Sequence, residues 1–160
     1  MKMKAVLLFV WLAVFATSQV ALAQSNAWVA RDVLILQSTK GYKSAVATAR
    51  QAATRLHAPL QLAGNLPNSQ TGLSLSRKDC ATNGFEYPAY VARGRGNDRN
   101  TYISVEYSAG YKGFAPGYYL VVAAVAQPGA ALVQKAFVAA RQWYPDAYAK
   151  RTQVWVGCIH

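Results

Sequence analysis

The sequence predicts an α+β fold, in which two main helices pack on one face of a mixed or antiparallel sheet. Two strand-helix-strand patterns lead to this prediction, one near the start of the chain and one at its end. In the later pattern, residues 118–125 form a nearly unbroken apolar run, which is typical of a strand buried on both faces. A helix-period segment continues to about Trp143, and residues 152–156 form a second apolar run. We therefore expect a buried strand, a helix and a closing strand in this part of the chain.

The earlier pattern begins with residues 32–37, a compact apolar run that is followed by turn-forming residues. Alanines recur at helix spacing over residues 42–56, which predicts a helix with one apolar face. Pro59 ends that helix, and residues 60–62 are expected to form a short strand that returns beside the first. Because the two patterns are alike, an internal duplication stays open.

The stretch after this first pattern has a different character. Residues 64–72 are rich in Asn, Pro, Ser and Gly, and they are expected to form a loop. Residues 76–82 suit a short helix, with Ser76 as its N-cap and Asp79 at the third helical position. We therefore expect a short ordered helix between the two patterns.

A predicted hairpin completes the insertion. Residues 85–92 and 101–107 are expected to pair as strands around a basic, glycine-containing turn at residues 93–100. The second of these strands alternates between apolar and polar residues, as a strand with one buried face does. The simplest layout is a ferredoxin-like sheet with helices on one face, to which the hairpin and the short helix are added.

The start of the chain predicts a cleaved signal peptide over residues 1–23. Lys2 and Lys4 precede an apolar segment at residues 5–16, and an Ala-Leu-Ala cleavage pattern ends at residue 23. An apolar segment of about 12 residues is shorter than the roughly 20 needed to span a bilayer. We therefore expect a mature chain of residues 24–160 that forms a single domain, is periplasmic or secreted, and does not span the membrane.

The charge of the chain favours anionic partners. The full sequence has 17 basic and 6 acidic residues, and removing Lys2 and Lys4 with the signal leaves a net charge of about +9. Export disfavours nucleic acid as the partner, so we expect peptidoglycan, another anionic envelope polymer or an envelope protein.

Cys80 and Cys158 are the two cysteines of the chain. In an oxidising compartment they predict one disulfide, which would contribute about 4.5 kcal/mol in the chain-entropy model. An alternative is a cysteine-dependent hydrolase with Cys80 as nucleophile and His57 or His160 as base, but a disulfide would consume the nucleophile. The two histidines do not have the spacing of metal ligands, so we expect no metal site and no cofactor.

Aromatic and basic side chains are concentrated in the predicted hairpin and in the approach to the central strand. Tyrosine rings suit stacking on sugars, and Arg and Lys bind carboxylates. We expect these side chains to share one exposed surface of the sheet, although tyrosines in strands are also often half-buried. The candidate ligand-binding residues are Tyr90, Arg93, Arg95, Tyr107, Tyr111, Lys112 and Tyr118.

The first strand and helix also resemble a known family. Residues 33–38 read Val-Leu-Ile-Leu-Gln-Ser, and Tyr42-Lys-Ser-Ala45 follows them after a turn. This pattern is similar to the opening of SPOR (sporulation-related repeat) domains, where a strand ends in a Gly-Ser-Phe-like turn before an Ala begins the helix. The resemblance implies a β-α-β-β-α-β ferredoxin-like fold that binds glycan strands of peptidoglycan, stripped of stem peptides, across its open sheet face. Ser38 is the one residue of that turn that matches, so it alone is added as a ligand-binding candidate.

These observations favour a non-catalytic periplasmic protein that binds peptidoglycan or another anionic envelope glycan. The alternative is a small periplasmic inhibitor or immunity protein, which would bind an enzyme that targets the envelope. In that case the tyrosine-rich loop at residues 108–118 would present its side chains to a cleft of the enzyme.

Overall fold

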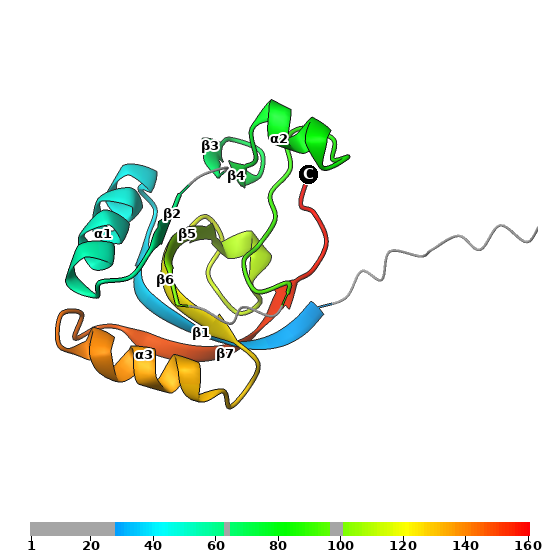
Figure 1. Ribbon diagram of the computed structural model, residues 1–160. Coiled ribbons are helices and arrows are strands. Elements are labelled where there is room, and N and C mark those ends of the chain that lie inside the picture. Colours follow the sequence, from blue (N-terminus) through cyan, green and yellow to red (C-terminus); the bar gives the residue numbers. More distant parts are fainter. Residues whose placement is uncertain (1–27, 63–64, 97–100) are drawn as a thin grey trace, which may run out of the picture.

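A five-stranded sheet with the strand order β2-β5-β6-β1-β7 forms the centre of the structure. The computed structural model describes residues 28–62, 65–96 and 101–160 (Figure 1). The predicted signal peptide and residues 97–100 of the predicted turn lie outside the described residues. The elements are β1 (Trp28–Thr39), α1 (Tyr42–Arg55), β2 (Leu60–Gln61), β3 (Leu66–Asn68), β4 (Gly72–Ser74), α2 (Arg77–Thr82), β5 (Ile103–Tyr107), η1 (Ser108–Gly110), β6 (Tyr119–Ala126), α3 (Ala131–Arg141) and β7 (Tyr148–Trp155).

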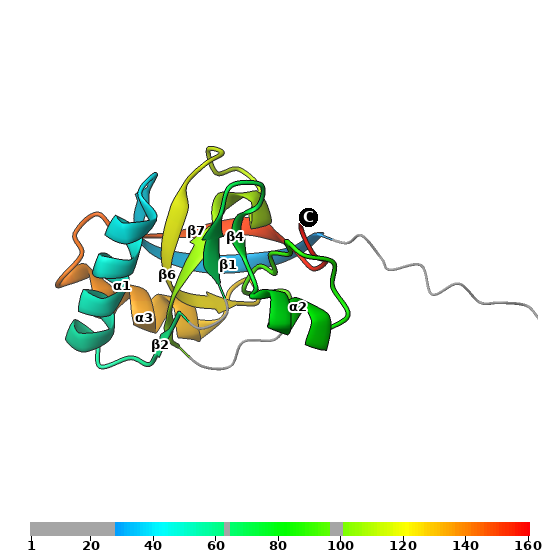
Figure 2. The ribbon, with the colours of Figure 1, turned by 90° about the horizontal axis from the view of Figure 1, so that it is seen from above.

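The topology confirms the predicted α+β class. β1 lies between β6 and β7 and is antiparallel to both, and β5 is antiparallel to β6. The order β7-β1-β6-β5 is therefore the four-stranded ferredoxin-like order, with β2 added in parallel at the edge beside β5. The helices α1 and α3 lie on one side of this sheet, whereas α2, β3 and β4 lie on the other (Figures 1 and 2).

Local sequence signals predicted the helices well. Ala45, Ala49 and Ala52 of α1 are fully buried, and such small side chains let a helix lie close to a sheet. Ser76 caps α2 as expected, because its Oγ accepts a hydrogen bond from the Asp79 N–H at 3.0 Å and donates one to Asp79 Oδ2 at 2.7 Å.

Two predictions about strand pairing were wrong. β2 does not return beside β1, because the long apolar strand β6 occupies that position and β2 pairs with β5. Residues 85–92 do not form a hairpin with β5, since β6 and β2 take the two edges of β5. Tyr90 makes only an isolated bridge with Ile159. The short hairpin lies earlier, where β3, within the predicted loop, pairs with β4 at the end of that loop around a turn held by Asn68 Oδ1.

The predicted disulfide is also corrected. Cys80 and Cys158 are both free and do not lie near each other. The Cys80 thiol is buried, and its Sγ lies 3.8 Å from the Leu75 carbonyl oxygen. The end of the chain is held instead by paired backbone hydrogen bonds between Tyr90 and Ile159, each 2.9 Å long.

Both faces of the central strands are covered. Every residue from 120 to 126 on β6 is buried, and successive strand side chains point to opposite faces. α1 and α3 cover one face. On the other face lies the insert, which we define as the described residues 65–96 between β2 and β5. Its Gly94 lies so close to the sheet that a Cβ there would be 2.5 Å from Val125 Cγ1.

No helix among the described residues is long and apolar enough to cross a membrane.

Candidate functional site

Two neighbouring pockets meet at the end of β1, and they share Ser38 and Tyr148. The larger, of about 600 Å³, lies against α1 and the turn between α3 and β7. The smaller, of about 220 Å³, lies against residues 113–118. Ser38 Oγ and Tyr148 OH are 3.3 Å apart where the pockets meet. We call the two pockets together the aromatic–basic groove, and its principal side chains are Ser38, Arg55, Phe114, Tyr118, Trp143, Tyr144, Tyr148 and Lys150.

The larger pocket owes its aromatic side chains to the turn that follows α3. Backbone N–H groups of Trp143 and Tyr144 both donate to the Ala140 carbonyl, at 3.0 and 2.9 Å, which closes the end of the helix. Ala147, which is buried, then anchors the chain before Tyr148 begins β7. As a result Trp143 and Tyr148 remain 51% and 39% exposed, so both are accessible to a ligand.

A cation lies beside these rings. Arg55 is the last residue of α1, and its guanidinium carbon is 5.4 Å from the centre of the Trp143 ring and 6.0 Å from that of Tyr144. Burial raises the pKa of Tyr144, and the charge of Arg55 opposes that rise in part. The Tyr144 hydroxyl is therefore protonated at neutral pH and can donate a hydrogen bond.

The smaller pocket repeats this combination of rings and cations. Lys150 Nζ lies 4.3 Å from the centre of the Phe114 ring and donates a hydrogen bond to the Gly113 carbonyl. Lys40 Nζ lies 5.5 Å from the centre of the Tyr118 ring. The groove therefore offers aromatic faces with a positive charge beside them on both sides of Ser38 and Tyr148.

Three of the residues predicted to bind ligand are buried instead. Tyr90, Arg93 and Tyr111 are 0%, 6% and 2% exposed, so the prediction that they share an exposed surface with the others was wrong. The Tyr90 hydroxyl donates to Glu106 Oε2 at 2.8 Å, the Arg93 backbone N–H donates to the same oxygen at 3.1 Å, and the Tyr111 hydroxyl donates to the Arg93 carbonyl at 2.9 Å. Burial raises the pKa values of Glu106, Tyr90 and Tyr111.

The guanidinium of Arg93 joins the insert to the sheet. Its Nη1 donates to the Tyr102 carbonyl at 2.8 Å, to Ser104 Oγ at 3.2 Å and to the Val122 carbonyl on β6 at 3.3 Å. The guanidinium carbon also lies 3.5 Å from the centre of the Tyr102 ring. These contacts describe a structural network that fastens the insert over the sheet face, so we leave it out of the candidate site.

The other predicted residues divide between the groove and separate surfaces. Ser38 and Tyr118 line the groove. Lys112 is exposed, and its Nζ lies 4.7 Å from the centre of the Trp28 ring, outside the groove. Tyr107 is half-buried against Tyr119, with ring centres 5.3 Å apart. Arg95 is exposed and lines a different pocket, of about 350 Å³, together with Arg93 and Glu106.

Sequence reasoning missed Arg55, Trp143 and Tyr148. The available signal was the Trp-Tyr-Pro sequence at residues 143–145, where two large aromatic residues stand between the end of a helix and a proline. Arg55 carried no such signal, because its place in the groove depends on how the end of α1 meets the start of β7.

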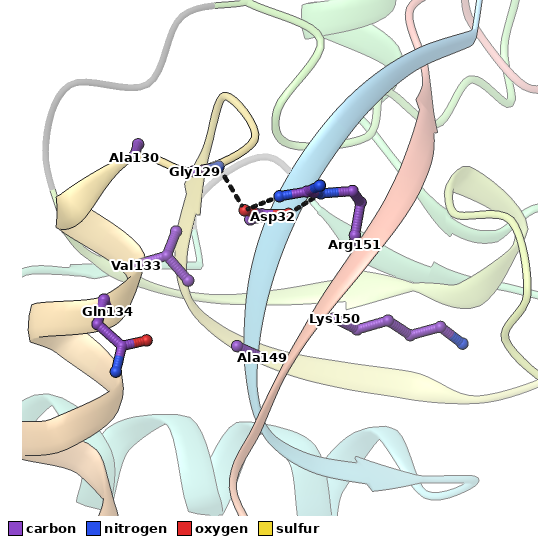
Figure 3. Close-up of a pocket in the computed structure, with 8 residues that line it drawn as sticks. All are labelled: Asp32, Gly129, Ala130, Val133, Gln134, Ala149, Lys150 and Arg151. Atoms are coloured by element: carbon purple, nitrogen blue, oxygen red, sulfur yellow. Dashed lines mark hydrogen bonds and ion pairs between the residues drawn. The ribbon is translucent and has the colours of Figure 1, made fainter.

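A fourth pocket, of about 460 Å³, lies between β7 and the start of α3 (Figure 3). Asp32 and Arg151 point toward each other there, joined by contacts of 2.8 and 3.1 Å, and the Gly129 N–H donates to Asp32 at 2.7 Å. The hydrogen bond from Arg151 holds the pKa of Asp32 below its ordinary value. Because these charges satisfy each other, we interpret this contact as a link between β1, β7 and the turn before α3.

This link predicts a pH-dependent contribution to stability. A carboxyl whose pKa is lowered by folding stabilises the protein above its ordinary pKa, and the contribution is lost as pH falls through the folded-state value. We expect Asp32→Asn to lower the melting temperature at pH 7 and to have a smaller effect near about pH 2. Thermal unfolding across this range tests it, with the exposed acid Glu86 changed to Gln as control. An equal effect of Asp32→Asn at both pH values would contradict the prediction.

In the part of the chain that the structure describes, no three side chains of His, Cys, Asp or Glu gather closely enough to hold a metal ion. No protein-family model, curated protein or solved structure matches the chain. The candidate site therefore rests on the geometry of the groove, which suits a ligand with flat apolar faces and hydrogen-bonding or anionic groups.

Proposed function

We propose that the protein is an exported, non-catalytic binding protein for peptidoglycan or another anionic envelope glycan, and that the aromatic–basic groove is its binding site. The observation that carries this proposal is the exposed pair Trp143 and Tyr148, with Arg55 and Lys150 beside them. Sugar rings have apolar faces that stack on aromatic side chains, while their hydroxyl and carboxylate groups pair with polar and cationic ones.

The shape and charge of the chain support a polymer as the ligand. Because Ser38 and Tyr148 line both pockets, the two pockets lie next to each other, and a chain of sugars is the kind of ligand that could contact both. The net charge of about +9 expected for the mature chain would attract an anionic polymer over distances of about 10 Å at moderate salt. Ser38, the single residue that the SPOR resemblance assigns to a ligand, lies where the pockets meet.

Pelleting of the mature chain with purified peptidoglycan sacculi tests the proposal. We expect binding at low salt that weakens as salt rises. The double variant Trp143→Ala/Tyr148→Ala removes two stacking surfaces, and it should lose about 1–3 kcal/mol of binding free energy, or roughly 5- to 150-fold in affinity. The measurement is the bound fraction as a function of sacculus concentration.

Tyr87→Ala provides a matched control. Tyr87 is also an exposed tyrosine, and the Arg77 guanidinium carbon lies 4.1 Å from the centre of its ring, but it belongs to the insert and not to the groove. Its substitution should leave pelleting unchanged. Equal losses in the control and the double variant would show that the groove is not the binding site.

The inhibitor alternative gives a different result. The loop at residues 108–118 keeps Tyr111 buried, and its exposed side chains include Ala109, Lys112 and Pro116. If the mature chain captures one stoichiometric protein from an envelope extract and does not pellet with sacculi at low salt, the glycan proposal is wrong and the inhibitor alternative is favoured.

A further inference from the structure

The outer edge of β7 is open over the first half of the strand. β7 pairs with β1 on its inner side, and no other strand of the described chain lies beside residues 148–151. Further along, the Lys112 N–H donates to the Gln153 carbonyl at 2.9 Å, so the backbone groups of Gln153 point outward. Because this direction alternates along an antiparallel strand, the N–H and C=O groups of Ala149 and Arg151 also point outward. They have no backbone partner among the described residues.

A pocket adjoins this open edge. It is the pocket of about 460 Å³ between β7 and the start of α3, and its apolar wall is formed by Ala130, Val133 and Ala149 (Figure 3). Ala149 and Arg151 are exposed, so α3 leaves this side of β7 partly uncovered. The side chain of Lys150 points away from Arg151, as expected for successive residues of a strand. A strand added at the outer edge would therefore direct every second side chain into the pocket.

The charge of this edge selects the kind of strand that it accepts. β7 carries Lys150 and Arg151 and has no acidic residue. Asp32 also lines the pocket, but its carboxylate is already paired with Arg151 at 2.8 Å. The net charge is therefore positive at the edge, as it is for the mature chain as a whole. Such an edge repels a second copy of this basic chain and attracts a strand with acidic side chains.

We propose that the outer edge of β7 binds an extended acidic segment of a partner protein, which adds to the five-stranded sheet as a sixth strand. The backbone of the segment pairs with Ala149 and Arg151, and its apolar side chains enter the pocket beside Val133. Its acidic side chains lie on the other face, on the side of Lys150. In this mode of recognition the main-chain hydrogen bonds supply affinity, and the pocket for alternate side chains supplies specificity. The surface is distinct from the aromatic–basic groove, so this inference goes beyond the proposed function.

A fluorescein-labelled octapeptide of alternating Glu and Val tests the proposal by fluorescence anisotropy with the mature chain. We expect saturable binding that weakens as salt rises. The peptide in which Lys replaces every Glu should bind at least about tenfold more weakly, because its charge matches that of β7. No binding of the acidic peptide, or equal binding of the two peptides, would overturn the proposal.

Methylation of the peptide backbone separates strand addition from simple charge attraction. One peptide carries an N-methyl group on every Val, and a second carries one on every Glu. Only one of these two sets of N–H groups can face β7, since the direction of the N–H groups alternates along a strand. One methylated peptide should therefore bind at least about tenfold more weakly, whereas the other should bind like the parent peptide. Equal binding of the two methylated peptides would contradict strand addition.

Ala149→Pro tests the same edge from the side of the protein. It removes the outward N–H of Ala149, and proline is tolerated on an outer strand where that N–H faces solvent. We expect the acidic peptide to bind at least about fivefold more weakly. Ala149→Ser keeps the N–H and should bind like the wild type, so equal affinities of the two variants would count against the proposal. If thermal unfolding shows that Ala149→Pro does not fold, the methylated peptides decide the question.

Sacculus pelleting keeps this inference distinct from the proposed function. Ala149 does not line the groove, so Ala149→Pro should pellet with sacculi like the wild type. A folded Ala149→Pro variant that loses both activities would show that the edge is not a separate site, and it would overturn the inference. A wild type that binds the acidic peptide but not sacculi would overturn the proposed function alone.

Sedimentation of the mature chain by itself tests a second copy as the occupant. We expect a monomer, because two basic edges repel each other. A dimer that Ala149→Pro dissociates would show that β7 pairs with a second copy, and the acidic partner would then be rejected.

Discussion

Replacing Arg93 with alanine should lower the free energy of unfolding by about 3–5 kcal/mol, because it breaks a buried charged network and leaves Glu106 without its positive neighbour. The change removes three hydrogen bonds from Nη1, one of which reaches β6 through the Val122 carbonyl. It also leaves the buried carboxyl of Glu106, whose pKa burial already raises, without the nearby charge that opposes that rise. Urea denaturation followed by tryptophan fluorescence measures the loss.

Arg95→Ala is the matched control for this prediction. Arg95 lies two positions along the chain and is exposed, so its substitution should change stability by no more than about 0.5 kcal/mol. Arg93→Lys should give an intermediate loss, because it keeps the charge but not the planar fork. If Arg93→Ala and Arg95→Ala are equally mild, the network does not fasten the insert.

Gly72→Ala is expected to cost about 2–4 kcal/mol, from an unfavourable backbone conformation and a steric clash together. Gly72 has a φ of 75°, and a Cβ there would lie 2.2–2.4 Å from three ring carbons of Tyr107. That ring has little room to move, since it packs against Tyr119, whose hydroxyl donates to the Gly72 carbonyl at 3.1 Å.

Gly84→Ala separates the two causes. Gly84 has a similar φ of 71°, but a Cβ there would meet no atom within 4 Å. Its substitution should therefore show only the backbone cost, about 1–2 kcal/mol. The difference between the two variants in urea denaturation measures the clash with Tyr107, and the absence of a difference would show that the ring yields without cost.

Features that depend on residues close together in the sequence could be predicted. The alanine spacing of α1, the Ser76 cap of α2 and the apolar run of β6 each carry their own local signal, and all three are in the structure. Strand pairing depends on distant segments, so the hairpin assigned to residues 85–92 and the position of β2 were wrong. The same limit applies to the cysteines. A pair of cysteines in an exported chain suggested a disulfide, but the positions of Cys80 and Cys158 do not support one.

The candidate site was predictable only in part for the same reason. The family resemblance pointed to Ser38, and the concentration of aromatic and basic residues pointed to Tyr118. Arg55 and Trp143, however, meet only where α1 approaches the turn after α3. Tyr90, Arg93 and Tyr111 have the composition of a binding surface, yet they fill the space between the insert and the sheet. The polar face of β5 suggested exposure to solvent, whereas Ser104 and Glu106 are buried beneath the insert.

The position of β7 at the outer edge of the sheet has a consequence for solubility. An outer strand offers backbone groups to which the edge of a second molecule could add, and charged side chains on such a strand oppose that addition. β7 carries Lys150 and Arg151 in its first half, and the opposite outer strand, β2, is only two residues long. Lys150 would thus have two roles: it is a cation of the groove, and its charge opposes self-association at high protein concentration.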